Sequence, residues 1–121
     1  MSGAESYRAG QSAEAQVARH YAARGLVEVA RRWRGRGGEI DLILRENLPA
    51  GVGHVFVEVK KSRDFARAAE RLNARQIARL QRAAEEFLAG LPGGLALPAR
   101  FDVALVDGQG QIHIIENAIW G

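Results

Sequence analysis

The residues of this sequence that could do chemistry together are three acids and a lysine on two short apolar stretches. The stretch "GEIDLI" carries Glu39 and Asp41, and "VFVEVK" carries Glu58 and Lys60. In a strand, residues i and i+2 lie on the same face, so each pair of charges shares a face. Carboxylates brought together can hold a divalent metal ion, and a nearby lysine can orient water or stabilise negative charge. This combination suits phosphodiester hydrolysis.

Pairing of the two stretches as an antiparallel hairpin would bring these charges together. A turn centred at residues 49–50 sets Asp41 opposite Glu58 and Glu39 opposite Lys60. Apolar residues complete both faces: Ile43 and Phe56 on the charged face, and Ile40, Leu42, Leu44, Val55, Val57 and Val59 on the other. A slip by one residue would destroy this separation, so the pattern specifies the register.

Asp41 opposite Glu58 would destabilise the sheet unless a cation lies between them. Mg²⁺ or Mn²⁺ is the expected cofactor, with these two acids as its ligands, because hard cations prefer carboxylate oxygens. An ordinary salt-bridge cluster with Lys60 is the alternative. Glu14 favours the metal site, because it lies on the inward face of a helix predicted over about 12–25. With Glu39 it makes four acids that could converge, too many for one lysine to neutralise.

The elements that must position these residues follow the order α-β-β-β-α-β-β. The predicted helices cover about 12–25 and 67–89, and the predicted strands cover 27–33, 39–45, 54–60, 100–107 and 111–116. Stretches rich in glycine and proline at 46–53 and 90–99 predict loops. Asp102 begins an otherwise apolar strand, so we expect it to be a structural hydrogen-bonding residue, with a place in the lining of the site as the alternative.

Length and composition predict one domain spanning 1–121. The chain has 47% hydrophobic and 26% charged residues, which is typical of a globular protein, and no cysteine for a disulfide framework. It contains neither an apolar run long enough to cross a membrane nor a basic head followed by an apolar stretch. We therefore expect a cytoplasmic protein without a membrane partner.

Basic residues are concentrated in two segments although the net charge is only +3. Residues 61–82 carry seven basic side chains and two acids, a local charge of +5, and "RRWRGR" at 31–36 carries four arginines. Arginine suits phosphate contacts, although a solvated surface explains either segment as well. The candidate nucleic-acid contacts are Arg34, Arg36, Lys61, Arg63, Arg71, Arg75 and Arg79. On the second helix the arginines are expected opposite the packing face, and Gln76 at its edge, turned toward the sheet.

Six motifs give the chain a resemblance to a known family over nearly its whole length: "GQSAEAQVARHYAARG", "RRWRGRGGEIDLI", "VFVEVK", "RLQRAAEEFL", "RFDVALVD" and "IENAIW". They resemble the YraN family of small bacterial proteins, with the pairing of "GEIDLI" and "VFVEVK" as the most specific feature. That family is similar to the restriction-endonuclease-like superfamily, which includes archaeal Holliday-junction resolvases. The resemblance implies a restriction-endonuclease-like core, in which a mixed central sheet is flanked by helices.

The superfamily pattern is an acid on the first helix, an aspartate on one strand and Glu-x-Lys on the next. Its matches here are Glu14, Asp41, and Glu58 with Lys60, so the resemblance implies a Mg²⁺-dependent nuclease. The chain departs from the family at Ser62, where arginine is usual. At a second position glutamine replaces the usual lysine, although related nucleases place a glutamine on this helix.

The expected activity is structure-selective cleavage of DNA by a metal-dependent endonuclease. Asp41 and Glu58 would bind the metal, Glu14 would support the metal or a water molecule, and Lys60 would position the nucleophile. Glu39 and Gln76 are expected to support these groups. A non-catalytic nucleic-acid-binding accessory protein of the same fold and a module that binds an acidic protein partner are the alternatives. Resolvases of this fold act as dimers, which implies a homodimer by analogy.

Overall fold

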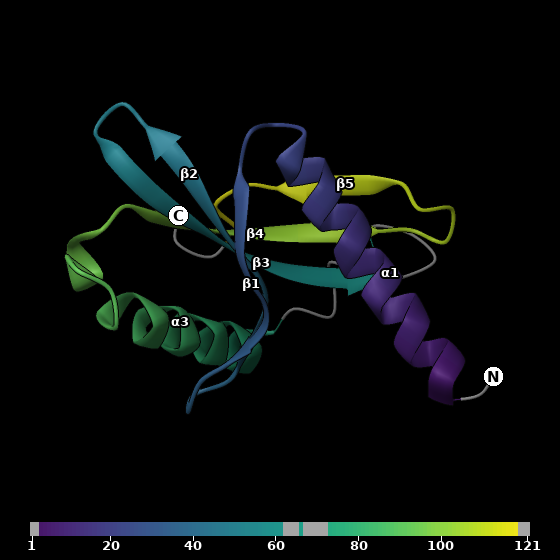
Figure 1. Ribbon diagram of the computed structural model, residues 1–121. Coiled ribbons are helices and arrows are strands. Elements are labelled where there is room, and N and C mark those ends of the chain that lie inside the picture. The colour runs from purple at the N-terminus through teal and green to yellow at the C-terminus, as the bar shows by residue number, and fades with distance from the viewer. Residues whose placement is uncertain (1–2, 62–65, 67–72, 119–121) are drawn as a thin grey trace.

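The computed structural model describes residues 3–61, 66 and 73–118, and in this part of the chain a sheet lies between two helices (Figure 1). The elements in chain order are α1 (Gly3–Ala22), β1 (Val27–Arg34), β2 (Glu39–Leu48), β3 (Gly51–Lys61), α3 (Ala74–Ala89), the short 3₁₀ helix η1 (Gly94–Ala96), β4 (Ala99–Val106) and β5 (Ile112–Ile115). This order confirms the predicted α/β class. None of the described helices is both long and apolar enough to cross a membrane.

The five strands form one mixed sheet in the order β1-β2-β3-β4-β5. Only the pair β3–β4 is parallel, and the other three pairs are antiparallel. Parallel neighbours need a crossover connection, and the chain segment containing α3 provides it. The arrangement is consistent with a restriction-endonuclease-like core, as the sequence predicts.

The β2–β3 hairpin has the predicted register. Leu42 pairs with Val57 and the last pair joins Leu48 to Gly51, so the turn is centred at 49–50. The prediction of a loop over 46–53 is wrong, because both strands continue to a tight turn. Pro49 lies in this turn and Gly51 directly follows it with a φ of 132° that favours glycine, whereas Gly53 is paired with Glu46 in the sheet.

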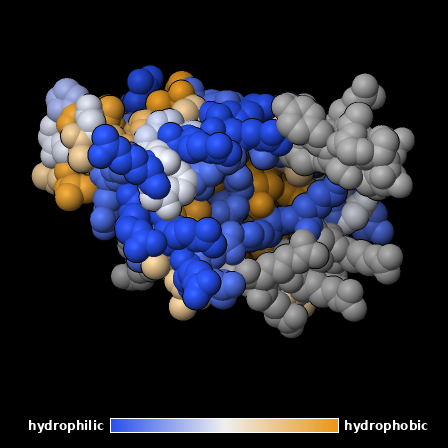
Figure 2. All heavy atoms as spheres, turned by 90° about the horizontal axis from the view of Figure 1, so that it is seen from below, coloured by the Kyte–Doolittle hydropathy of each residue, from blue (hydrophilic) through white to orange (hydrophobic). Residues whose placement is uncertain are grey.

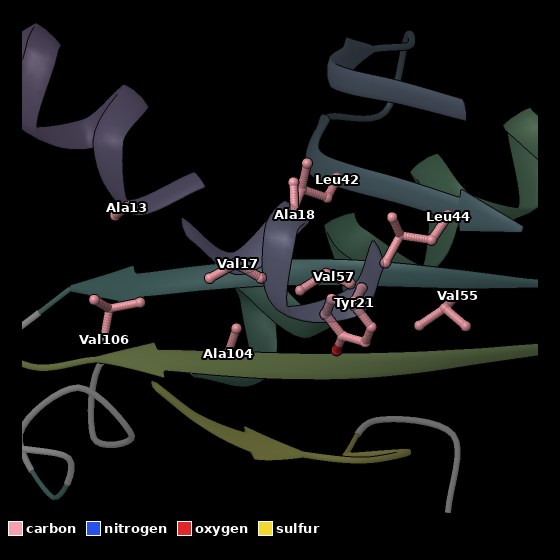
Figure 3. Packing of buried hydrophobic residues seen from close by; sticks show 10 residues of the cluster. All are labelled: Ala13, Val17, Ala18, Tyr21, Leu42, Leu44, Val55, Val57, Ala104 and Val106. Atoms are coloured by element: carbon pink, nitrogen blue, oxygen red, sulfur yellow. The ribbon is translucent and has the colours of Figure 1, made fainter. Parts of the chain in front are cut away.

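One face of the sheet is covered by α1, as Figure 3 shows from close by. Val17 and Tyr21 are fully buried against Leu42 and Val57 from the central hairpin. The helix begins at Gly3, earlier than the predicted start at about residue 12. Its apolar stripe nevertheless falls at the predicted residues, so the sequence pattern located the buried part of this helix.

Asp102 has the structural role predicted from its place at the start of an apolar strand. Its side chain is completely buried and accepts a hydrogen bond of 2.8 Å from the hydroxyl of Tyr21. It also accepts hydrogen bonds from the backbone N–H of Asn117 at 3.0 Å and from Nε of Arg100 at 3.1 Å. These partners satisfy a charge that would otherwise be costly to bury.

The other face of the sheet is covered by α3, whose residues Leu80, Ala83, Ala84 and Leu88 are buried. The prediction of one helix over 67–89 is wrong at Asn73, which has extended backbone angles. Its side chain accepts a 2.9 Å hydrogen bond from the N–H of Gln76 and so begins the helix at Ala74. Residues 67–72 lie outside the described residues.

Ile40 is the exception to the predicted faces of the hairpin. It packs in the α3-side cluster with Ile43 and Phe56, not on the opposite face. Regular pairing of β2 with β3 ends at Leu42 and Val57, and the backbone N–H of Val59 in β3 donates to the Asp41 side chain. The simple alternation of faces therefore breaks at the point where the charged residues begin.

Candidate active site

A pocket lies where the charged ends of β2 and β3 meet α3. It has a volume of about 240 Å³ and is lined by Gly38, Glu39, Asp41, Glu58, Gln76, Arg79 and Leu80. Three of the predicted site acids, Glu39, Asp41 and Glu58, thus line the same pocket as the predicted glutamine, Gln76. The register of the hairpin places the acids of β2 and β3 next to each other. Because α3 begins at Ala74, directly after its cap Asn73, Gln76 lies in the first turn of the helix and lines the pocket from the α3 side.

The electrostatics of the pocket are dominated by the pairing of Glu58 with Asp41. Glu58 is only 8% exposed. Burial, a side-chain hydrogen bond with Asp41 and the negative charge of that neighbour raise the pKa of Glu58 to about 9, while Lys60 and Gln76 act in the opposite direction. Asp41 also accepts a 2.8 Å hydrogen bond from the backbone N–H of Val59. In the metal-free protein the protonated form of Glu58 is therefore favoured at neutral pH.

Glu39 lines the same pocket but is more exposed. Its carboxylate accepts a hydrogen bond of 3.2 Å from Nη2 of Arg34, and the side chains of the pair are 38% and 80% exposed, respectively. An ion pair of this kind contributes little stability. Glu39 therefore keeps much of its freedom to respond to a ligand in the pocket.

Glu14 is the predicted site acid that does not line the pocket. Its buried carboxylate accepts hydrogen bonds of 3.0 and 3.2 Å from Nε of Arg32. Arg32 lies in β1 and has a positive φ of 53°. Within residues 3–61, 66 and 73–118, no three histidine, cysteine or acidic side chains form a group that could hold a metal ion. Asp41 and Glu58 are hydrogen-bonded in a pocket that Glu39 also lines, but the three acids do not form a three-ligand cluster, and the part of Glu14 in the site stays a prediction.

The two lysines at the end of β3 have different surroundings. Lys60 is half-buried and its charge acts on Glu58, so it lies within electrostatic reach of the pocket. Lys61 lines a separate pocket of about 210 Å³ next to Gln16 of α1 and Asp107. The predicted phosphate contact of Lys61 would therefore be made outside the pocket that holds Glu39, Asp41 and Glu58.

The candidate nucleic-acid contacts that the structure describes are exposed. They are Arg34, Arg36, Lys61, Arg75 and Arg79; Arg63 and Arg71 lie outside the described residues. Seen from below, hydrophilic residues cover much of the described surface (Figure 2). Arg79 departs from the expectation that the helix arginines lie opposite the packing face, because it lines the pocket.

The turn "RGRGG" between β1 and β2 is a part of the site that the sequence interpretation missed. The N–H of Arg36 in this turn donates to both oxygens of Glu86 on α3, at 2.8 and 3.1 Å. A Cβ atom at Gly35 would collide with the Glu86 carboxylate and the Trp33 ring. In the sequence, Gly37 and Gly38 directly before Glu39 were the one indication that this turn lies close to α3.

Comparison with known proteins identifies the family. The model of "Uncharacterised protein family UPF0102" matches residues 13–106. The chain belongs to the UPF0102 family. This is the YraN family expected from the sequence motifs, so that prediction is confirmed.

Relatives in the UPF0102 family are similar over almost the whole chain. A UPF0102 protein of Ruegeria pomeroyi is 60% identical over 96% of this chain and 91% of its own length. A UPF0102 protein of Cereibacter sphaeroides is 57% identical over 98% of this chain and 97% of its own, and one of Dinoroseobacter shibae is 44% identical over 95% and 83%. The UPF0102 match spans all residues that line the acidic pocket.

Proposed function

We propose that this UPF0102 protein is a metal-dependent nuclease that hydrolyses phosphodiester bonds of DNA. The observation that supports it most is the pocket shared by Asp41 and the buried Glu58, in which burial and the neighbouring carboxyl group raise the pKa of Glu58 to about 9. A protein gains no stability from burying two acids against each other. Such pairs are commonly kept for chemistry.

The donor groups of the pocket fit a hard divalent cation. The paired Asp41 and Glu58 present carboxylates, the ligands that Mg²⁺ and Mn²⁺ prefer, and Mg²⁺ is usually held by one or two carboxylates, with water molecules and substrate oxygens for which this pocket leaves room. Burial and the neighbouring Asp41 raise the pKa of Glu58, and a bound cation would compensate the repulsion between the two carboxylates. We assign Asp41 and Glu58 as the residues that would hold the ion.

The remaining residues would act around this pair. When bound, the ion would polarise the phosphoryl group and lower the pKa of a water molecule. Lys60 would orient the water or balance the charge of the phosphate, and Gln76 holds the carboxyl of Glu58 by a side-chain hydrogen bond. Glu14 would join the site only by leaving Arg32.

Structure-selective cleavage is the form of the activity that we propose. The exposed arginines near the pocket would contact phosphates, which provide affinity without reading the base sequence. Within the described chain, the pocket is lined by a single turn of α3 and by strand ends, not by an element shaped to enter a groove. A branch or flap would therefore be recognised by its shape.

Cleavage assays test the proposal directly. Wild type, Asp41→Asn and the control Asp107→Asn, an acid of the β4–β5 turn, are incubated with branched, flapped and linear DNA in Mg²⁺ or Mn²⁺. We expect cleavage by wild type and the control, and none by Asp41→Asn. Equal cleavage by all three proteins would reject the assigned site and indicate a contaminating nuclease.

A non-catalytic nucleic-acid-binding protein is the second candidate. It is favoured by the pairing of Glu14 with Arg32, which leaves the pocket with fewer acids than the superfamily pattern provides. In that case all three proteins would bind branched DNA equally and none would cut it. The same assay with a binding readout therefore separates the two functions.

A further inference from the structure

We infer that Arg79 binds the phosphate group that is cleaved, inside the acidic pocket. The inference rests on the proposed nuclease function and assigns within it the residue that attracts the substrate. Arg79 would thus act differently from the other exposed arginines, which would contact phosphates along the DNA.

The position of Arg79 is fixed by the packing of α3 against the β1–β2 turn. A Cβ atom at Gly38 would lie 3.5 Å from the carbonyl oxygen of Arg79 and 3.7 Å from its Cβ atom, so the two backbones are close neighbours. The hydrogen bonds from Arg36 to Glu86 fasten the same β1–β2 turn to α3 about two helical turns further along the helix. The base of the Arg79 side chain is therefore held beside Glu39 and the pocket.

The charges of the pocket make such a residue necessary. The lining includes three acids, and Arg79 is the one cationic side chain among the lining residues that the structure describes. A phosphodiester is anionic, so the acids would repel it until their charge is compensated. A guanidinium beside them offers two parallel N–H donors, the geometry that matches two oxygens of one phosphate.

Arg79 is also available for a ligand within the described part of the chain. The acids of the pocket have other partners there: Arg34 for Glu39, and Asp41 and Gln76 for Glu58. No ion pair of Arg79 is found among the described residues, and its side chain is exposed. Arg75 lies one turn earlier on the same helix and is exposed too, but it does not line the pocket, so it provides a matched control.

The test is the affinity for a fluorescein-labelled branched DNA, measured by anisotropy in Ca²⁺ and in EDTA. Ca²⁺ takes carboxylate ligands as Mg²⁺ does, and should tighten binding by wild type. We expect Arg79→Ala to bind about tenfold more weakly than wild type in Ca²⁺. Arg79→Lys should bind with an affinity between the two, because lysine keeps the positive charge but lacks the paired N–H donors of the guanidinium group. In EDTA, Arg79→Ala should weaken binding only as much as Arg75→Ala.

The outcomes separate this inference from the proposed function. If Ca²⁺ tightens binding by wild type but Arg79→Ala loses no more than Arg75→Ala, the assignment of Arg79 is wrong and the metal site stands. If wild type binds DNA equally in Ca²⁺ and EDTA and cuts no DNA in Mn²⁺, both the proposed nuclease function and the assignment of Arg79 to the cleaved phosphate are wrong. Thermal melting of each variant verifies that it is folded, and the partial recovery by lysine would not arise from a merely structural role.

Discussion

At the scale of single residues, the cost of burying Glu58 beside Asp41 is the central feature of the molecule. Burial and the neighbouring acid raise the pKa of Glu58 from its ordinary value of 4.5 to about 9. The folded protein therefore holds a proton that the unfolded chain releases above pH 4.5. By linkage, the free energy of unfolding of the metal-free protein should fall as the pH rises from about 4.5 to 9.

The substitution Glu58→Gln tests this expectation in EDTA. It keeps the shape of the side chain and removes the titration, so it should stabilise the protein at pH 8 by about 1–2 kcal/mol and flatten the fall toward high pH. Urea unfolding of wild type and variant at pH 5, 6.5 and 8 provides the measurement. Marked destabilisation at every pH would instead indicate that Glu58 belongs to a stabilising salt-bridge cluster with Lys60.

Metal binding to the same pair should appear as thermal stabilisation. A ligand that binds only the folded state adds about 2.7 kcal/mol at a hundred times its Kd, so we expect the Tm of wild type to rise by several degrees in Mn²⁺. Asp41→Asn and Glu58→Gln should lose this shift, and Asp107→Asn should retain it. A shift that survives in the two pocket variants would place the bound ion elsewhere.

At the scale of elements, the β1–β2 turn holds α3 against the pocket through two glycines with different surroundings. A Cβ atom at Gly35 would collide with Glu86 and Trp33, whereas one at Gly38 would make ordinary contacts of 3.5 to 3.9 Å with Arg79. Gly35→Ala should therefore destabilise the protein by about 1–3 kcal/mol, and Gly38→Ala by much less. Urea unfolding compares them, and equal effects would show that the turn is not tightly packed.

The sequence predicted elements well wherever a simple repeat of polar and apolar residues decided the structure. Alternation fixed the register of the hairpin and so the meeting of Asp41 with Glu58. It failed at Ile40, because a side-chain hydrogen bond to the backbone replaces regular pairing there. The pairing of Glu14 with Arg32 was equally hidden, because neither this contact nor the positive φ of Arg32 follows from a repeat of polar and apolar residues.

At the scale of the whole molecule, the two faces of the sheet have different tasks. The α1 side holds a core closed by the buried Asp102, and the α3 side combines a core with the pocket and exposed arginines. Both helices thus contribute to the core, and of the two only α3 contributes residues to the pocket lining that the structure describes. The helix α3 therefore packs on one face and presents charge at the pocket.

Binding to nucleic acid should report on the whole basic surface. If phosphate contacts dominate, the logarithm of the affinity for branched DNA falls linearly with the logarithm of salt concentration. Arg75→Ala should weaken binding of every DNA tested to a similar extent and reduce the magnitude of this slope by about 1. Affinity that hardly depends on salt would contradict a phosphate-binding surface and favour an acidic protein partner.

The most direct test of the account is to locate the ion. Crystals of wild type soaked in Mn²⁺ should give an anomalous scattering peak between the carboxyl groups of Asp41 and Glu58, within coordination distance of both. Crystals of Glu58→Gln should lack it. A wild-type map without a peak at this pocket, at a Mn²⁺ concentration that occupies other sites, would contradict the claim that these two acids form a metal site.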